Sequence, residues 1–283
     1  MRVLVTGSAG FIGQAVAAEL AGRGWEMEPF DHPADVRHAA ELDDAVDAVD
    51  AVINLAGVLG TAEIIGAEYE AAAVNVLGAI NVLNAAGRAG VPLVQIATGH
   101  EEQPNPYAIT KRCATDLALA RARWSGQPVT VVRAYHVYGP GQKPPAPHGP
   151  SAVRKIVPSF VCRALTGMPI EVWGSGRQVI DLVYVADVAA VLVDAIGGPY
   201  GQVVEAGTGK PTTVLDAARD VLDEVMNWHV GPVPWSRVER LPMRPGEPED
   251  ATVVASAPAC LNPWPHRLAE TVDWYRDYLA GRP

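Results

Sequence analysis

The fold prediction starts from one segment, Val3-Leu4-Val5-Thr6-Gly7-Ser8-Ala9-Gly10-Phe11-Ile12-Gly13. Its apolar, β-branched first half predicts a buried strand, and its three spaced glycines predict a turn. A helical pattern follows directly, with apolar side chains on one face and Gly24 as a stop signal. A strand, a glycine-rich turn and a helix in this order are typical of a dinucleotide-binding site.

The three glycines have separate roles in such a turn. Gly7 permits the tight turn, Gly10 lets the backbone approach a pyrophosphate, and Gly13 lets the helix pack closely on the strand. The pyrophosphate would bind free N–H groups at the positive end of the helix dipole. An ordinary glycine-rich turn between a strand and a helix is the alternative. The predicted cofactor contacts in this turn are Gly7, Ala9, Gly10, Phe11, Ile12 and Gly13.

The second predicted strand, Trp25–Phe30, ends in Asp31. A carboxylate at this position accepts hydrogen bonds from the adenosine ribose hydroxyls of a dinucleotide. It would repel the 2′-phosphate of NADP, and the following His32-Pro33 offers no arginine to reverse this. NAD is therefore the predicted cofactor, with Asp35 and Val36 near its adenine. A turn-capping role for Asp31 is the alternative.

Strand and helix patterns alternate along the following residues. A short acidic helix is predicted over 40–50, a long helix over Ala67–Ala89 and a strand over Leu93–Thr98. The segment Ala51–Gly57 reads as a buried strand that ends in small residues, as a backbone passing a cofactor requires. Further cofactor contacts are predicted at Leu55, Ala56 and Gly57.

Tyr107 and Lys111 are four residues apart in a predicted helix, which places them on one face, one turn apart. A phenol titrates near pH ~10, too high for a base at neutral pH. A lysine ammonium beside it would favour the phenolate and lower that pKa. Lys111 could also reach the nicotinamide ribose. Ordinary packing on the helix surface is the alternative for both residues.

Composition limits the possible function classes. The chain has 283 residues, 49% of them apolar and 19% charged, which suits one large α/β unit or two joined lobes and excludes disorder. Its net charge of -10 disfavours nucleic-acid and anionic-membrane partners. Cys113, Cys162 and Cys260 lack metal-ligand spacing, so no metal site is expected. Without a membrane-length apolar run or room for a signal peptide, a cytoplasmic protein is expected.

A series of motifs along the chain is familiar in its order. The motifs are the Gly7/Gly10/Gly13 turn, Asp31, Asn54–Gly57, Asn75–Asn81, Tyr107/Lys111, Arg133–Pro140, Ile170–Gly174, Asp181–Val188, Ala206–Gly209, Arg244–Glu247 and Glu270–Tyr275. Together they resemble the extended short-chain dehydrogenase/reductase superfamily, in particular its NAD-dependent sugar-nucleotide epimerases and dehydratases.

The resemblance implies a Rossmann-like, doubly wound parallel sheet with a smaller C-terminal α/β lobe for the substrate. The expected NAD-binding domain covers 1–138 with 178–206, the nucleotide-sugar lobe covers 139–177 with 207–265, and a C-terminal helix covers 266–283. It further implies NAD contacts at Asn75 and Tyr135. Its catalytic residues would be Tyr107 as base, Lys111 as its electrostatic partner, and Thr98 bonded to the reacting oxygen.

The resemblance also implies substrate contacts, and here the sequence departs from the family. The loop between Thr98 and Tyr107 is short, and Glu101 and Glu102 in it are either a solvated edge or acid–base groups for an elimination. His136 replaces the usual asparagine, and Ile180 replaces the usual arginine. The expected substrate contacts are His136, Arg177 as a substitute cation, Arg244 for the diphosphate, Val172, Glu101 and Glu102.

The function expected on this basis is the modification of a nucleoside-diphosphate sugar through a transient 4-keto intermediate. A 4-epimerase is the leading hypothesis and a dehydratase is the alternative, followed by a simple reductase or a non-catalytic NAD-binding regulator. A homodimer is expected to form through the helix over Ala67–Ala89 and the helix starting at Tyr107.

Overall fold

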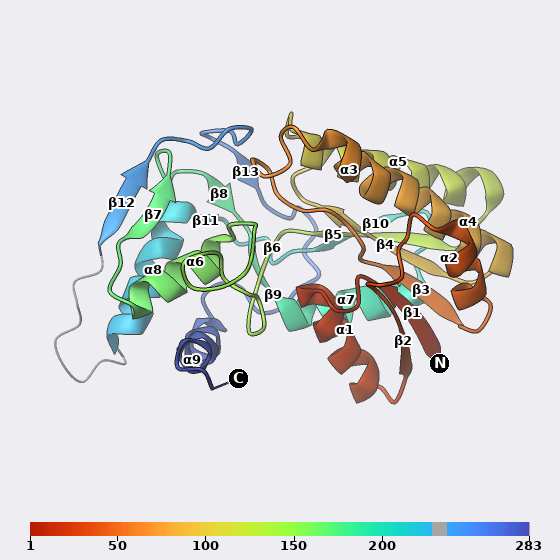
Figure 1. Cartoon of the computed structure of the whole chain (residues 1–283), viewed down its shortest axis with the longest axis horizontal. Helices are drawn as coiled ribbons and strands as arrows, with labels where there is room; N and C mark the ends of the chain where they lie inside the picture. Colours follow the sequence, from red (N-terminus) through yellow and green to blue (C-terminus); the bar gives the residue numbers. More distant parts are fainter. Residues whose placement is uncertain (228–236, 283) are drawn as a thin grey trace.

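The computed structural model describes residues 1–227 and 237–282 of the chain. They form two lobes with a cavity between them; the larger lobe lies on the right in Figure 1 and the smaller on the left. No helix in the described ranges is long and apolar enough to cross a membrane.

The larger lobe is built on a six-stranded parallel sheet. Its strands, from one edge to the other, are β10 (Val203–Ala206), β5 (Val129–Ala134), β4 (Leu93–Thr98), β3 (Ala51–Asn54), β1 (Arg2–Thr6) and β2 (Glu26–Phe30). The strand order reverses at β1, because β2 pairs on one side of it and β3 on the other. Ligands bind such sheets at this reversal, outside the carboxyl ends of the strands. The predicted doubly wound sheet is confirmed.

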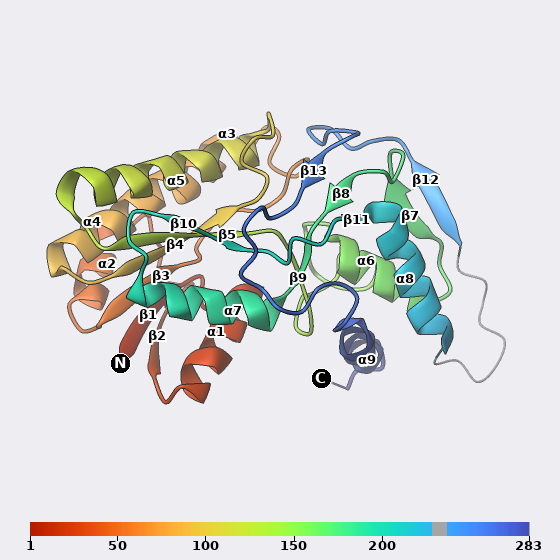
Figure 2. The ribbon, with the colours of Figure 1, turned by 180° about the vertical axis from the view of Figure 1, so that it is seen from behind.

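The alternation of side chains along β1 divides the lobe into two cores. Val3 and Val5 pack on α1 (Phe11–Gly22), α7 (Val185–Asp194) and the 3₁₀ turn η2 (Ala195–Gly197). Leu4 points to the opposite core, which contains side chains of α2 (Ala39–Val46), α4 (Ala79–Ala89) and α5 (Pro106–Ser125). Figure 2 shows α1 and α7 on one face of the sheet and α4 and α5 on the other. Burial on both faces explains the continuous apolar runs of the strands.

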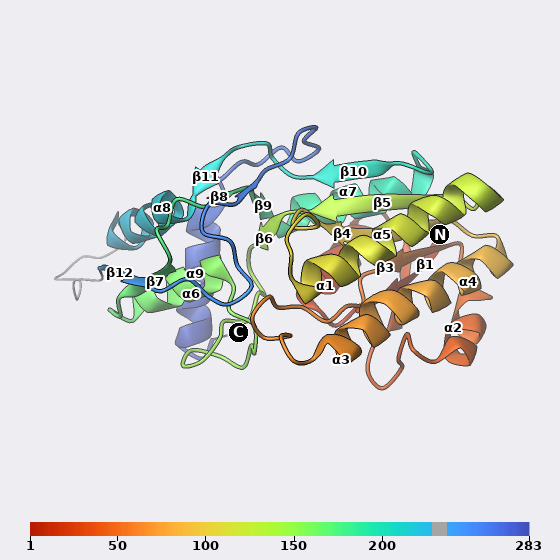
Figure 3. The same cartoon turned by 90° about the horizontal axis from the view of Figure 1, so that it is seen from above.

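The smaller lobe has its own core, which includes the buried rings of Tyr138, Phe160, Trp264 and Tyr275. Its elements are β6 (His136–Tyr138), α6 (Ile156–Leu165), β7 (Ile170–Trp173), β8 (Val179–Ile180), β9 (Leu182–Tyr184), β11 (Thr212–Thr213), α8 (Val214–Asn227), β12 (Val238–Leu241), β13 (Thr252–Val253) and α9 (Leu268–Leu279). The expected C-terminal helix is α9. Two strands, β6 and β9, pair directly beyond β5 and form the junction between the lobes (Figure 3).

Two predicted elements differ from the structure. The helix expected over Ala67–Ala89 is divided into α3 (Glu68–Ala72), a π-helical segment η1 (Ala73–Gly78) and α4. The proline- and tryptophan-rich composition of Val230–Pro245 predicts a loop that carries Arg244 to the cleft, and this prediction is wrong in part, because Val238–Leu241 pair in parallel with β7. This pairing outweighs the proline-rich composition of the flanks. Residues 230–236 of that prediction lie outside the described residues.

Candidate functional site

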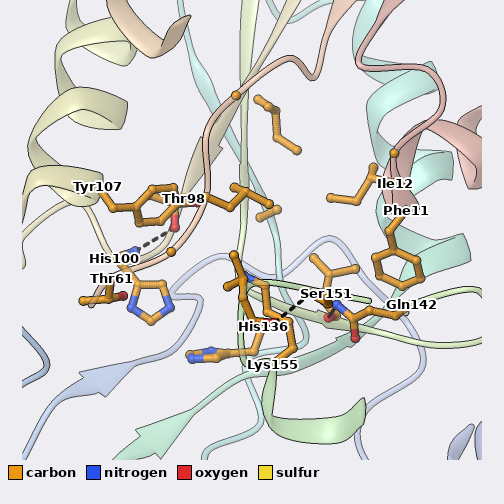
Figure 4. A pocket seen from close by; sticks show the side chains of 18 of the residues that line it. Phe11, Ile12, Thr61, Thr98, His100, Tyr107, His136, Gln142, Ser151 and Lys155 are labelled. Atoms are coloured by element: carbon orange, nitrogen blue, oxygen red, sulfur yellow. Dashed lines mark hydrogen bonds between the residues drawn. The ribbon is translucent and has the colours of Figure 1, made fainter. Parts of the chain in front are cut away.

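A cavity of about 980 Å³ lies between the two lobes. The larger lobe supplies its floor from the glycine-rich turn and the carboxyl ends of β1, β3, β4 and β5. The smaller lobe supplies β6, the segment 151–160 and parts of β7 and β8. Figure 4 shows Tyr107 and Thr98 on one wall, Phe11 and Ile12 on the opposite wall, and Lys155 below. The volume suits a ligand as large as a dinucleotide with a second molecule beside it.

The glycine-rich turn forms one end of the cavity, and two of its glycines are sterically required. Gly7 has a φ of 68°, and a Cβ there would lie 3.0 Å from the backbone N of Ala56. A Cβ on Gly13 would lie only 2.4 Å from the carbonyl oxygen of Gly7. All six turn residues predicted to contact the cofactor line the cavity. The turn therefore has the shape that a bound pyrophosphate needs.

Asp31 follows β2 and lies beside this turn. Its Oδ2 accepts a hydrogen bond from the backbone N of Ala9 at 2.8 Å, and its Oδ1 accepts one from the N of His32 at 2.8 Å. Asp35 and Val36 also line the cavity. The Arg37 guanidinium hydrogen-bonds to Asp35 and holds the pKa of that carboxyl below its ordinary value. The acidic wall at Asp31 is where a ribose with free hydroxyls would bind.

A buried polar network that the sequence analysis missed shapes the next wall. The Thr6 hydroxyl donates to Asn54 Oδ1 at 2.5 Å and accepts hydrogen bonds from the backbone N atoms of Leu55 and Ala56 at 3.1 Å. Asn54 Nδ2 in turn donates to Gln95 Oε1 at 2.8 Å. The network fixes the segment 55–57, whose three residues, the predicted cofactor contacts, line the cavity.

Asn75 supports the cavity from behind instead of lining it. It lies in η1, where its Oδ1 accepts from the backbone N of Val58 at 2.8 Å. Its Nδ2 donates to the Val58 carbonyl and to Thr110 Oγ1, both at 3.1 Å. Asn75 therefore joins the segment after β3 to α5, so a direct contact with the cofactor does not follow from this arrangement.

Tyr107, Lys111 and Thr98 meet at the carboxyl end of β4, and all three line the cavity. Asn105 caps α5 by accepting from the Ala108 N at 2.9 Å, and this cap fixes the start of the helix at Pro106, directly before Tyr107. Burial raises the pKa of Tyr107, the Thr98 hydroxyl opposes this rise, and the Glu101 charge adds to it. Burial lowers the pKa of Lys111 to about 8. The expected lowering of the Tyr107 pKa is thus not observed, because desolvation disfavours both charged forms.

Glu101 and Glu102 are not in the cavity, which contradicts their prediction as substrate contacts. Glu101 is buried beneath α5, where it accepts from Thr115 Oγ1 at 2.5 Å and forms an ion pair with Arg133 at 2.7 Å. Glu102 is exposed. The chain turns as it leaves β4, with the Gln103 N donating to the His100 carbonyl at 2.9 Å, and within this turn the Glu101 side chain points toward α5 and β5 instead of the cavity. The prediction of Glu101 as a solvated loop edge is also wrong.

Arg177 and Val172 are likewise outside the cavity. Arg177 is an exposed side chain with Asp250 as a distant partner at 4.0 Å, so it does not replace the cation missing at Ile180. Val172 is fully buried in the core of the smaller lobe. Its neighbours on β7, Glu171 and Trp173, line the cavity instead, because successive side chains of a strand point to opposite faces.

Arg244 lines the cavity within a group of charged side chains. It forms an ion pair with Glu63, a second with Glu247 at 3.3 Å, and lies 5.9 Å from the ring centre of Trp173. Lys155 lines the same wall, and burial lowers its pKa. Arg244 and Lys155 therefore face the cavity from the side of the smaller lobe, each next to carboxylates.

His136 and Tyr135 line the cavity where β5 passes into β6. The Tyr135 hydroxyl donates to Glu205 Oε1 at 2.9 Å, so its ring and not its hydroxyl faces a ligand. His136 Nδ1 is buried and has no partner among the described residues. Its ring packs edge-on against His100, with ring centres 4.5 Å apart. His100, Gln103, Gln142 and Ser151 are cavity residues that the sequence analysis did not predict. The signal that could have indicated His100 is its place two residues after Thr98, at the carboxyl end of a predicted strand.

The sequence of the chain is similar to those of known proteins. A family model described as the NAD dependent epimerase/dehydratase family matches residues 3–207. The dTDP-glucose 4,6-dehydratase of an Actinoplanes species is 34% identical over 188 residues, covering 64% of this chain and 54% of that protein. The enzyme of the same name from Streptomyces antibioticus is 33% identical over 221 residues, covering 70% and 61%. The chain thus matches little more than half the length of these curated dehydratases.

Solved structures match along the whole chain. The UDP-glucose 4-epimerase of Thermus thermophilus, solved with NAD, has 26% sequence identity and a TM-score of 0.81, covering 98% of this chain and 99% of that one. The UDP-glucose 4-epimerase of Thermotoga maritima, solved with UDP-glucose, has a TM-score of 0.87 at 22% identity and therefore supports the fold alone.

Proposed function

Because the chain belongs to the NAD-dependent epimerase/dehydratase family, we propose that it binds NAD and transiently oxidises a nucleoside-diphosphate sugar. The observation that carries this proposal is the meeting of Tyr107, Lys111 and Thr98 beside the glycine-rich turn, in one cavity. The turn, Asp31 and the segment 55–57 would hold the dinucleotide. The sugar would lie against Tyr107 and Thr98.

Tyr107 takes the proton of a sugar hydroxyl, usually the one on C4 in this family, while Thr98 hydrogen-bonds to the same oxygen. When bound, oxidised NAD supplies the hydride acceptor and a positive charge that favours the Tyr107 phenolate. Lys111 adds a second positive charge from one helical turn along α5. In an epimerisation Tyr107 would return its proton to the same sugar oxygen, and the bound cofactor would supply a hydride to the opposite face of the carbon, so that the configuration there would be inverted.

Arg244 and Lys155 are the proposed contacts of the diphosphate. Both line the cavity, and a planar guanidinium can bind phosphate oxygens in a bidentate manner. Glu63 pairs with Arg244. Burial raises the pKa of Glu247, and the negative charge of Glu63 adds to this rise. An anionic substrate would compete with Glu63 for the guanidinium, so we expect this ion pair to rearrange on binding.

The structure of the loop after Thr98 favours 4-epimerisation over dehydration. An elimination needs a second acid–base group near the keto sugar, and Glu101 and Glu102 both lie outside the cavity. Dehydration stays the alternative, because the curated relatives at 34% and 33% identity are dehydratases.

The test is incubation of the NAD-loaded protein with UDP-glucose and dTDP-glucose in deuterated water, followed by proton NMR and mass spectrometry. A product of unchanged skeleton with inverted C4 supports the epimerase. Loss of water with deuterium at the eliminated centre contradicts epimerisation and supports the dehydratase. A steady loss of the reduced-nicotinamide absorbance when reduced NAD is supplied, with release of oxidised NAD, would indicate a simple reductase. No conversion, despite tight NAD binding, would contradict catalysis and favour the regulatory hypothesis.

A further inference from the structure

His100 is the first side chain after Thr98 that enters the cavity. Gly99 cannot carry a side chain, because a Cβ there would lie 2.6 Å from Cδ1 of the Tyr135 ring. The backbone N of His100 donates to Thr98 Oγ1 at 3.3 Å, which ties the two residues together at the end of β4. Figure 4 shows the His100 ring next to Thr98 and Thr61, on the wall that also carries Tyr107. An imidazole therefore lies at the sugar end of the proposed site.

A chain of amide side chains behind His100 fixes which way each amide points. Asn105 Oδ1 accepts from the backbone N of Ala108 at 2.9 Å, and Asn105 Nδ2 donates to the Gly246 carbonyl at 3.2 Å. Both partners are backbone groups with only one possible role, so the orientation of the Asn105 amide is determined. Asn105 Nδ2 also donates to Gln103 Oε1 at 3.2 Å. Gln103 must then present its NH₂ group on the other side.

That NH₂ group contacts His100. Gln103 Nε2 lies 2.9 Å from Nδ1 of the His100 ring. Because an amide NH₂ can only donate, Nδ1 must accept, and a neutral imidazole then carries its proton on Nε2. A backbone turn, with the Gln103 N donating to the His100 carbonyl at 2.9 Å, holds the two side chains in register. The N-cap of α5 thus fixes the tautomer of a residue five positions earlier.

The surroundings keep this imidazole neutral. Burial lowers the pKa of His100 to about 4, and the positive charge of Lys155 acts in the same direction. The groups that face it are His136 at 4.5 Å between ring centres, Gln103 and the more distant Lys155. The pKa of His136 is also far below its ordinary value, chiefly through burial, and the charge of Lys155 acts in the same direction. A second proton on the His100 ring is therefore disfavoured near neutral pH.

We propose that His100 is a catalytic hydrogen-bond donor, locked by Gln103 and Asn105 in the Nε2–H tautomer, that binds an oxygen of the sugar beside the Tyr107 and Thr98 pair. This inference rests on the proposed function. His100 keeps its proton throughout, so no bond is made or broken at the ring. The hydrogen bond strengthens as the sugar oxygen gains negative charge during hydride and proton transfer. Gln103 and Asn105 are positioning residues that act through His100.

The tautomer can be measured without any turnover. Histidine labelled with ¹⁵N in the NAD-loaded protein gives distinct nitrogen and carbon correlations for the two neutral tautomers, and a His100→Gln variant assigns the signal. We expect the Nε2–H form from neutral pH down to about pH 5. Gln103→Glu, which replaces a donor by an acceptor, should convert His100 to the Nδ1–H form and raise its pKa. A wild-type Nδ1–H tautomer, or an unchanged tautomer in Gln103→Glu, would overturn the lock.

Kinetics with UDP-glucose and dTDP-glucose test the role toward the sugar. His100→Phe, which keeps a ring but has no donor, should lower kcat on the order of 100-fold, the usual effect of losing one such donor. His100→Gln keeps an N–H at a similar reach and should restore part of the rate. Gln103→Glu should lower kcat more than it raises KM. The matched control is Gln202→Glu, at an exposed residue outside the cavity. Wild-type kcat in His100→Phe would overturn the proposal.

A third readout separates this proposal from the proposed function. Adding the sugar nucleotide in a single turnover should reduce bound NAD in the wild type, which the reduced-nicotinamide absorbance reports. Tyr107→Phe should abolish this reduction, whereas His100→Phe should slow it. If the wild type reduces no NAD and forms no product, the proposed function and the contact with the sugar both fail, while NMR still decides the tautomer. If Tyr107→Phe abolishes NAD reduction but the His100 variants reduce NAD and turn over as the wild type does, the proposed function stands and this inference fails.

Discussion

Tyr107 and Lys111 lie in a site where burial works against their charges. Burial raises the pKa of the phenol, and it lowers that of the ammonium to about 8. A phenolate beside an ammonium is therefore not the resting state of the protein. A further positive charge in the cavity would favour the phenolate. This couples the basicity of Tyr107 to the presence of the oxidised cofactor.

Tyr107→Phe removes the phenol and leaves the ring in place. We expect kcat with UDP-glucose or dTDP-glucose to fall by at least ~10²-fold, because the hydroxyl proton loses its acceptor. NAD affinity, measured by calorimetry, should change little, since the glycine-rich turn and Asp31 are untouched. Full turnover in this variant would contradict the mechanism.

His100 should also make the protein sensitive to acid. Its pKa in the folded protein is about 4, whereas an unfolded histidine titrates near pH ~6.5. The unfolded chain therefore binds this proton first, and stability is lost as the pH falls from about 6.5 toward 4, by up to ~1.4 kcal/mol per pH unit. Denaturant titrations at several pH values should find a shallower loss in His100→Gln than in the wild type.

The control for this experiment is His266→Asn, at an exposed histidine outside the cavity. It should keep the acid sensitivity of the wild type. The lowered pKa values of the buried His136 and of the Asp35 carboxyl also make the folded protein less stable as the pH falls. They remain in every variant, so the difference between variants isolates His100. Parallel curves for wild type and His100→Gln would contradict the assignment.

At the scale of elements, the loop from Gly99 to Asn105 depends on α5 and β5 for its shape. Glu101 anchors it from below by pairing with Arg133 of β5 and by accepting from Thr115 of α5. Glu101 points away from the cavity, whereas His100 and Gln103 on either side of it line the cavity. A short loop is thus held by one buried ion pair, and the family's longer loop is not needed to shape this wall.

Glu101→Gln tests this anchor. The amide keeps the shape of the carboxylate but leaves the half-buried Arg133 with a weaker partner, and breaking a buried pair in this way costs about 3 kcal/mol or more. Arg133 also lies 3.6 Å from Glu205, which offsets part of that cost. Glu102→Gln, at an exposed position, is the matched control and should change the unfolding free energy by less than ~0.5 kcal/mol. Equal denaturation midpoints would contradict the anchoring role.

The π-helical segment between α3 and α4 has a similar supporting function. A π turn adds one residue to the helix and often marks a functional position. Here it turns Asn75 toward Val58 and Thr110, so the segment after β3 is tied to α5. A Cβ on Gly78, the last residue of the segment, would lie 2.6 Å from the Val36 side chain. The π segment therefore connects both walls of the proposed cofactor site.

At the scale of the whole molecule, the two lobes supply different parts of the proposed site. The larger lobe supplies the turn, the acidic wall and Tyr107, whereas the smaller lobe supplies Lys155 and Arg244. Movement of one lobe relative to the other would change the distance between Tyr107 and the proposed diphosphate contacts. Glu63 lies in the larger lobe and Arg244 in the smaller, so their ion pair connects the two lobes. If the substrate displaces Glu63 from Arg244, substrate binding breaks this connection.

We also propose that the chain forms a homodimer through α3, η1 and α5. Large apolar side chains are exposed on these elements: Tyr69, Leu77, Ile109 and Trp124. Such side chains gathered on neighbouring helices suit an interface. Light scattering should give twice the mass of the chain, 29.9 kDa, and a Leu77→Asp/Ile109→Asp double variant should be monomeric. Met226→Asp, at an exposed residue of α8, is the control. A monomeric wild type would contradict this proposal.

The sequence alone determined the features that local chemistry encodes. Alternating apolar strands, glycines required by a tight turn and a tyrosine four residues before a lysine each follow from short-range geometry. They predicted the doubly wound sheet, which is confirmed, and the positions of the turn, Asp31, Tyr107 and Lys111 around one cavity. Sequence spacing can do this because strand pleat and helical turn repeat within a few residues.

Only the tertiary structure decided which polar side chains face the ligand. Glu101, Glu102, Arg177 and Val172 turned out to lie outside the cavity, and the pairing of Arg244 with Glu63 joins residues 181 positions apart. The tautomer of His100 depends on a backbone amide in α5 and a carbonyl at Gly246. These outcomes rest on contacts between distant segments. No local pattern encodes them, because a side chain's partner is set by the packing of whole elements.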